Sequence, residues 1–204
     1  GIARTSWGAR VMTVQPIKDK RKLQRMMKVL EDQNPRNALL FRVGLNTILR
    51  IQDILDLKVN NIFHDDGRFR LYLSLFERKT RKSKSRQMKN IKLNSLLRKE
   101  LKEYVEFFEL TSEDYIFFSL HNPDNNLDRV EAWRMLKKAA DKVGIENFGT
   151  HSMRKTLAWT IYKQTKDISL VMIMLNHNSP KTTLRYLGSP RKALIKLMKS
   201  SPYD

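Results

Sequence analysis

The sequence of 204 residues predicts a mainly helical α+β fold with one small antiparallel β-hairpin. Most segments repeat apolar residues at helical spacing, which is typical of amphipathic helices. Residues 69–76 instead alternate apolar and polar side chains, as a half-buried strand does, and residues 89–93 are a shorter strand candidate. Hydrophobic residues make up 41% and charged residues 30%, so the chain has enough apolar side chains to bury a core.

The first helices are predicted over residues 18–30 and from Asn34-Pro35, since proline is tolerated in a first turn. Gly44 to Thr47 is expected to interrupt the second helix. The apolar residues that follow fit one face of a short helix, which places Arg50 beside the core at the entrance of that helix. An arginine in such a position needs an anion or solvent.

Further helices are predicted from Asn94 and over residues 130–143, where Gly144 ends the helix. The last third is predicted to be almost entirely helical. Its expected elements are residues 152–163, a helix capped by Asp167, a short helix from Ser179 to Gly188, and a basic helix over 190–199.

The charge of the chain indicates its partner. Lys and Arg number 40 against 21 Asp and Glu, which gives a net charge of +19. A basic chain can owe its charge to solubility alone, but an excess of this size favours a polyanion as partner. There is no cysteine, and the four histidines do not form a recognisable metal site. No apolar run approaches the roughly 20 residues of a membrane span, so we expect a cytoplasmic, nucleoid-associated protein without a membrane partner.

Three short segments carry residues suited to phosphate chemistry. His151 and Arg154 stand three residues apart at a predicted helix start, where free N–H groups also attract an anion. Arginine holds phosphate with a planar fork of donors. His177 follows a helix end, and Tyr186 becomes a nucleophile where positive charge stabilises its phenolate. Each signal alone is weak, and a lone tyrosine at helical spacing is more often a core residue.

Taken together and in chain order, these segments resemble the tyrosine recombinase (phage integrase) family, from about Val14 to Gly188. The matching motifs are GLNTILRIQDIL at 44–55, ERKT at 77–80, THSMRKT at 150–156, LNHNS at 175–179 and TLRYLG at 183–188. The resemblance implies the catalytic-domain fold of that family. It also implies an enzyme that breaks and rejoins DNA at specific sites for a phage or mobile element, without metal or other cofactor.

The resemblance also implies a role for each matched residue. Tyr186 would attack the scissile phosphate to form a 3′-phosphotyrosine, while Lys79 would protonate the departing 5′-oxygen. Arg50 and Arg154 would stabilise the charge that develops on the phosphate. The remaining roles are phosphate binding by Arg50 and Arg154, proton transfer assisted by His151, a hydrogen bond to phosphate from His177, and support of Arg50 by Asp53.

A strongly basic hairpin tip is expected to lie against DNA phosphates. It contains Arg78, Arg81, Lys82, Lys84 and Arg86, and Lys82 or Lys84 could compete with Lys79 as the general acid. By resemblance, the partners are double-stranded DNA, further copies of the chain in a tetramer on that DNA, and accessory DNA-bending or directionality proteins.

The sequence pattern and the resemblance together predict the domain organisation. Residues 1–14 are expected to be a tail or linker remnant, residues 15–189 the catalytic domain, and residues 190–204 a basic helix that docks on a neighbouring protomer. Since the family usually carries an additional N-terminal helical domain, we expect the chain to be a catalytic fragment.

One position departs from the family pattern. Ile48 stands where the family usually has glycine, and we expect Gly44 or Asn46 to supply the unusual backbone instead. Two alternatives remain open. One is a type IB topoisomerase, which uses a similar set of residues without a partner site, and the other is a DNA-binding relative whose site is impaired by Ile48.

Overall fold

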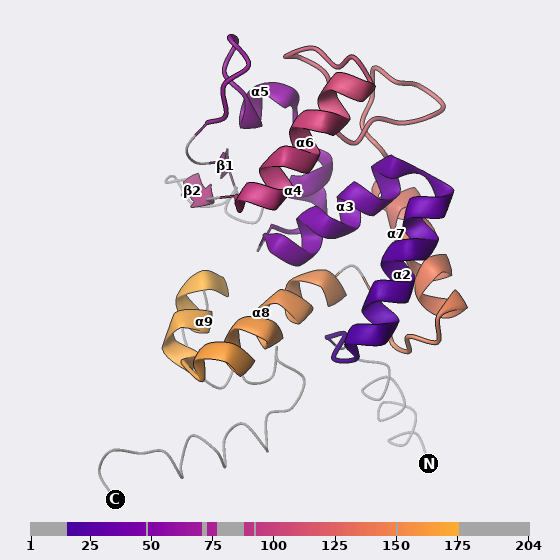
Figure 1. Cartoon of the computed structure of the whole chain (residues 1–204), viewed down its shortest axis with the longest axis vertical. Coiled ribbons are helices and arrows are strands. Elements are labelled where there is room, and N and C mark those ends of the chain that lie inside the picture. The colour runs from indigo at the N-terminus through magenta and orange to yellow at the C-terminus, as the bar shows by residue number, and fades with distance from the viewer. Residues whose placement is uncertain are drawn as a thin grey trace, which may run out of the picture.

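The computed structural model describes residues 16–47, 49–70, 73–76, 88–91, 93–149 and 151–175, and this part of the chain is mostly helical (Figure 1). The helices and strands, in chain order, are α2 (Lys20–Gln33), α3 (Pro35–Asn46), α4 (Ile51–Leu55), α5 (Val59–Ile62), β1 (Leu73–Phe76), β2 (Met88–Ile91), α6 (Ser95–Phe107), α7 (Arg129–Lys142), α8 (Ser152–Thr165) and α9 (Ile168–Leu175).

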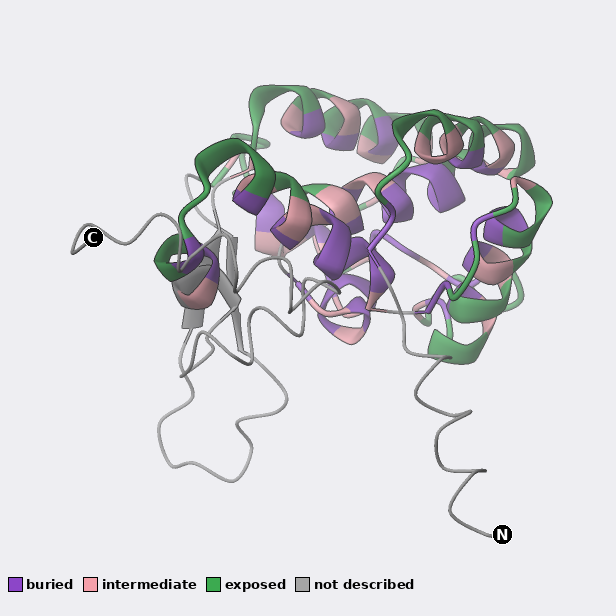
Figure 2. Cartoon of the chain, turned by 90° about the horizontal axis from the view of Figure 1, so that it is seen from below, coloured by how far each residue is buried: buried purple, intermediate pink, exposed green. Residues whose placement is uncertain are grey.

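Helix α3 lies at the centre of the domain. It packs against α2, α4, α6, α7 and α8, and its residues are buried along nearly its whole length (Figures 1 and 2). The reason lies in its sequence, because the run Ala38-Leu39-Leu40-Phe41 presents apolar side chains on every side of the helix. The surrounding helices are amphipathic and turn their polar faces outward (Figure 2).

The helix starts are set by the capping residues that the sequence predicts. Asn34 accepts a hydrogen bond from the Arg36 amide at the start of α3, and Asn94 accepts one from the Leu97 amide at the start of α6. These side chains satisfy N–H groups that the helix itself leaves without partners. The Leu170 amide likewise donates to Asp167 Oδ1 at 3.0 Å, so the predicted cap of α9 is confirmed.

The predicted break at Gly44 to Thr47 is right for the end of the helix and wrong for Gly44. Helix α3 continues through Gly44 to Asn46 and ends at Thr47, whose backbone N–H donates to the Val43 carbonyl. Among the described residues, neither Gly44 nor Asn46 has a positive φ, so neither supplies an unusual backbone turn. Ile48 itself lies outside the described residues. Gly44 serves packing instead, because Met153 of α8 occupies the space that a Cβ would need.

Strands β1 and β2 pair antiparallel, with Leu73 opposite Ile91 and Phe76 opposite Met88. The sequence predicts these strands at 69–76 and 89–93, and the described pairing falls at 73–76 and 88–91, while Phe69 forms an isolated bridge with Phe63. The connection between β1 and β2, which carries the basic tip, lies outside the described residues.

Helix α8 joins two hydrophobic clusters. Met153 near its start belongs to the main core around α3, whereas Ala158 and Tyr162 pack with Ile168 and Val171 in a second cluster beneath α9. The first turn of α8 is therefore held by the main core. None of the helices in the described ranges has the length and apolar character to cross a membrane.

Candidate active site

Arg50 occupies the N-cap position of α4, at the point where the chain enters the helix. Helix α4 is held on the core by its buried side chains Ile51, Ile54 and Leu55. The backbone of the half-buried Arg50 is therefore fixed in place. Its Nε is buried and has no hydrogen-bond partner among the described residues. A buried donor without an acceptor costs about 1–3 kcal/mol. The arrangement favours an anion that completes the hydrogen bonding of this guanidinium.

Asp53 lies on α4 three residues after Arg50 and is 6% exposed. Residues three apart on a helix share a face, which places this carboxylate beside the entrance that Arg50 occupies. Its place in the first turn also suits a negative charge, because the helix dipole is positive there.

His151 and Arg154 stand together at the start of α8. His151 is the N-cap residue without a side-chain cap, and Arg154 is 4% exposed in the first turn. The local backbone is firmly tied, since the Gly149 amide donates to Ser152 Oγ and the Ser152 amide donates to the Gly149 carbonyl, each at 2.9 Å. A buried arginine at a helix N-terminus produces a concentrated positive potential.

The C-terminal end of α3 connects the two arginine-bearing elements. Gly44 packs against Met153, the residue before Arg154, and the chain then runs from the end of α3 at Asn46 through Thr47 to Arg50. Thr47 is 1% exposed, and its hydroxyl donates to the Val43 carbonyl at 2.8 Å. The C-terminal part of α3 thus contacts both α4 and α8.

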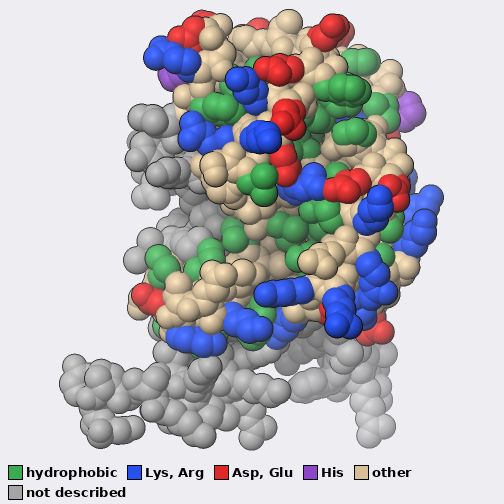
Figure 3. Space-filling model, in the orientation of Figure 1, with side chains coloured by type: hydrophobic (Ala, Val, Ile, Leu, Met, Phe, Trp, Pro, Cys, Tyr) green, Lys and Arg blue, Asp and Glu red, His purple; other side chains and the backbone are tan. Residues whose placement is uncertain are grey.

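Lys155, next to Arg154, adds a second buried cation. It is 9% exposed, and burial lowers the pKa of its ammonium group because the charged form loses hydration. Figure 3 shows that Lys and Arg side chains also gather along the lower part of the displayed face.

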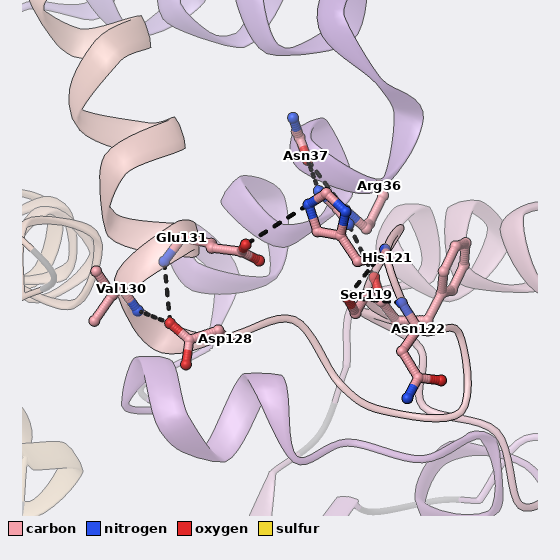
Figure 4. Close-up of polar contacts among 9 residues, drawn as sticks. Arg36, Asn37, Ser119, His121, Asn122, Asp128, Val130 and Glu131 are labelled. Carbon is pink, nitrogen blue, oxygen red and sulfur yellow. Dashed lines mark hydrogen bonds and ion pairs between the residues drawn. The ribbon is translucent and has the colours of Figure 1, made fainter.

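Arg36 is a contrasting buried arginine (Figure 4). Its Nε and Nη2 donate to Asn37 Oδ1 at 3.2 and 3.0 Å, and its Nη1 donates to the Phe118 carbonyl at 2.9 Å. Burial lowers the pKa of this guanidinium. Because its donors are satisfied within the fold, Arg36 connects α3 to the segment before α7, whereas the Nε of Arg50 has no such partner in the described part of the chain.

The other predicted site residues lie outside the described residues: Lys79, His177, Tyr186 and the basic residues Arg78, Arg81, Lys82, Lys84 and Arg86. Within the described ranges, no group of His, Cys, Asp or Glu could hold a metal ion. Thr156 ends the THSMRKT motif, but the motif alone assigns it no role; in the structure its hydroxyl donates to the Ser152 carbonyl at the start of α8.

Comparison with solved structures identifies the fold as that of the tyrosine recombinase catalytic domain. The crystal structure of XerA recombinase superimposes with a TM-score of 0.68 at 19% identity, over 92% of this chain and 65% of that chain. The pre-cleavage complex of XerH site-specific recombinase bound to difH gives a TM-score of 0.65 at 19% identity, over 94% of this chain and 55% of that chain.

The sequence comparison then defines the family. Residues 18–192 match the model of the phage integrase family. The chain is also 36% identical over 175 residues to the probable integrase/recombinase YoeC of Bacillus subtilis strain 168, covering 86% of this chain and 90% of YoeC. The chain therefore belongs to the phage integrase family, and the predicted class of a tyrosine-type site-specific recombinase is confirmed.

Proposed function

We propose that this chain exchanges DNA strands at specific sites through a covalent 3′-phosphotyrosine intermediate. The observation that supports it most directly is the pair of helix starts held by the end of α3. One start presents Arg50, whose buried Nε lacks an acceptor among the residues that the structure describes, and the other presents His151 with the buried Arg154. A scissile phosphate between them supplies the missing acceptor oxygens.

In the cleavage step, the Tyr186 hydroxyl oxygen bonds to phosphorus while the bond from phosphorus to the 5′-oxygen breaks. His151 accepts the tyrosine proton, and Lys79 donates a proton to the departing 5′-oxygen. Arg50 and Arg154 stabilise the charge that develops on the non-bridging oxygens, His177 adds a hydrogen bond, and Asp53 orients Arg50.

In the rejoining step, the 5′-hydroxyl of a partner strand attacks the phosphotyrosine and releases Tyr186. One phosphate ester replaces another in each step, so the sequence of reactions needs no external source of energy and no metal.

Double-stranded DNA is the proposed substrate. The net charge of +19 favours a polyanion, and the XerH structure with the same fold is bound to its difH site. The β-hairpin contributes Arg78, Arg81, Lys82, Lys84 and Arg86 to the DNA backbone.

The proposed assembly is a tetramer on DNA, completed by residues 190–204 docking on a neighbouring protomer and assisted by accessory DNA-bending or directionality proteins. Residues 15–189 are the catalytic domain, residues 1–14 lead into it, and the reaction takes place on the nucleoid in the cytoplasm.

A library of nicked duplexes tests the proposal, because the 5′-hydroxyl fragment diffuses away after attack and leaves a trapped adduct. The wild-type chain is expected to form a covalent DNA adduct that Tyr186→Phe abolishes. Tyr115→Phe, which removes a hydroxyl remote in sequence from the motifs, is the control and should still form it. Binding of DNA without adduct would indicate a binding-only relative, and relaxation of supercoils without strand exchange would indicate a topoisomerase.

A further inference from the structure

A short segment before α2 is fastened to the helix that carries Arg154. We define residues 16–19 as the N-terminal clasp. The backbone N–H of Ile17 donates to Thr156 Oγ1 of α8 at 2.8 Å, across a sequence separation of 139 residues. Thr156 is 3% exposed and Ile17 is 7% exposed, so this hydrogen bond is shielded from water.

The hydroxyl of Thr156 continues the connection to the start of α8. It donates to the Ser152 carbonyl at 2.6 Å, so the same oxygen accepts a bond from the clasp and gives one to the first turn. In that turn, Ser152 is fully buried and the Lys155 amide donates to the His151 carbonyl at 2.9 Å. A continuous hydrogen-bonded path therefore leads from Ile17 to the turn that contains His151 and Arg154.

A second contact lies one helical turn further along the same face of α8. The Nζ of Lys18 stands 4.0 Å from the centroid of the Trp159 ring, a distance at which a cation is attracted to the ring face. Thr156 and Trp159 are three residues apart and share one face of the helix. Ile17 and Lys18 of the clasp thus contact Thr156 and Trp159, which lie one turn apart on α8.

We propose that Thr156 is a positioning residue, and that the N-terminal clasp holds the first turn of α8 in the geometry that catalysis needs. The inference rests on the proposed function of His151 and Arg154. Threonine suits this position because its hydroxyl accepts and donates at once, which the isosteric valine cannot do. A movement of residues 16–19 would then shift the first turn of α8, because the Thr156 side chain is hydrogen-bonded to both.

Three variants isolate the effect. Thr156→Val removes both hydrogen bonds at nearly constant volume, whereas Thr156→Ser retains the hydroxyl. Thr160→Val is the matched control, because the Thr160 hydroxyl also donates to the carbonyl four residues before it, that of Thr156, but receives no bond from the clasp among the described residues.

The readout is the rate constant of adduct formation at saturating nicked DNA, measured well below the unfolding temperature of each variant. This rate constant falls when His151 and Arg154 are held less firmly in position. We expect about a tenfold fall for Thr156→Val, with the Kd for DNA nearly unchanged. Thr156→Ser and Thr160→Val should stay close to the wild type. An unchanged rate for Thr156→Val, or an equal fall in Thr160→Val, would overturn the inference.

Amide hydrogen exchange on the DNA-free chain tests the clasp without relying on activity. Thr156→Val should lose protection at Ile17 and across residues 152–155, while Thr160→Val should keep it. Unchanged protection in Thr156→Val would refute the clasp. A wild-type chain that forms no adduct would refute the proposed function instead, and the exchange data would still decide whether the clasp holds α8.

Discussion

Gly44 of α3 lies so close to Met153 of α8 that a Cβ on the glycine would stand 2.9 Å from Met153 Cε and 3.1 Å from Met153 Cβ. The two helices can approach this closely only because position 44 has no side chain. Met153 precedes Arg154 directly, so this contact determines how deeply the arginine sits beside the end of α3.

Gly44→Ala tests that contact. Alanine favours a helix over glycine by about 0.5–1 kcal/mol, but overpacking a buried contact costs about 1–3 kcal/mol. We therefore expect a net loss of roughly 1 kcal/mol in the free energy of unfolding, together with slower adduct formation, measured by urea unfolding and on nicked DNA.

The same substitution in a Met153→Ala background provides the control. Met153→Ala removes Sδ and Cε and leaves only the Cβ at 3.1 Å, so Gly44→Ala should cost clearly less there than in the wild type. An equal destabilisation in both backgrounds would show that the contact with Met153 is not the cause.

Arg50→Met should separate catalysis from stability. The substitution removes a buried donor that has no acceptor in the described ranges, so the free energy of unfolding should stay the same or rise. Adduct formation should fall by about 100-fold or more, because a preorganised charge near the phosphate is lost. Urea unfolding and adduct kinetics measure the two effects, and full activity of Arg50→Met would contradict the assigned role.

Arg36→Met should behave in the opposite way. The change leaves the Phe118 carbonyl and Asn37 Oδ1 without their donor, which should destabilise the fold by about 2–3 kcal/mol. Adduct formation at saturating DNA should remain close to the wild type in the folded fraction. A selective loss of catalysis with intact stability would place Arg36 in the active site after all.

Tyr104→Phe should reveal a pH-dependent contribution to stability. The Tyr104 hydroxyl donates to the Ile116 carbonyl at 2.8 Å and is buried, so its removal should cost about 1–2 kcal/mol near neutral pH. Burial raises the pKa of Tyr104 above its ordinary value. The folded chain thus keeps this proton at pH values where the unfolded chain loses it.

The sign follows from that difference. Above about pH 10 the unfolded state alone ionises at Tyr104, so the stability contributed by the tyrosine falls as the pH rises. The advantage of the wild type over Tyr104→Phe should shrink by up to about 1.4 kcal/mol per pH unit in this range. Urea unfolding near neutral pH and near pH 11 measures it, and a constant difference would refute the shifted pKa.

The helices that begin with a capping side chain could be predicted from sequence. Asn34, Asn94 and Asp167 each precede an apolar helical pattern, and a cap acts on amides only two or three residues away. Local interactions of this kind are visible in the sequence itself. The five short motifs, taken together in chain order, likewise indicated the family, because each is a local run of residues.

Gly44 was misinterpreted for the opposite reason. A glycine in a helical pattern reads as a possible break, and the partner that explains it, Met153, lies more than a hundred residues away. Thr156 lies within a motif, but its contact could not be predicted for the same reason, since its hydrogen bond to Ile17 spans 139 residues of the chain.

The sequence by itself therefore determined the helical segments, the family and the set of residues suited to phosphate chemistry. Only the tertiary structure decided that Arg36 is satisfied within the fold, that Arg50 Nε has no partner among the described residues, and that α3 and residues 16–19 contact the start of α8. Burial and hydrogen-bond partnership depend on contacts between distant segments, and no local pattern in the chain encodes them.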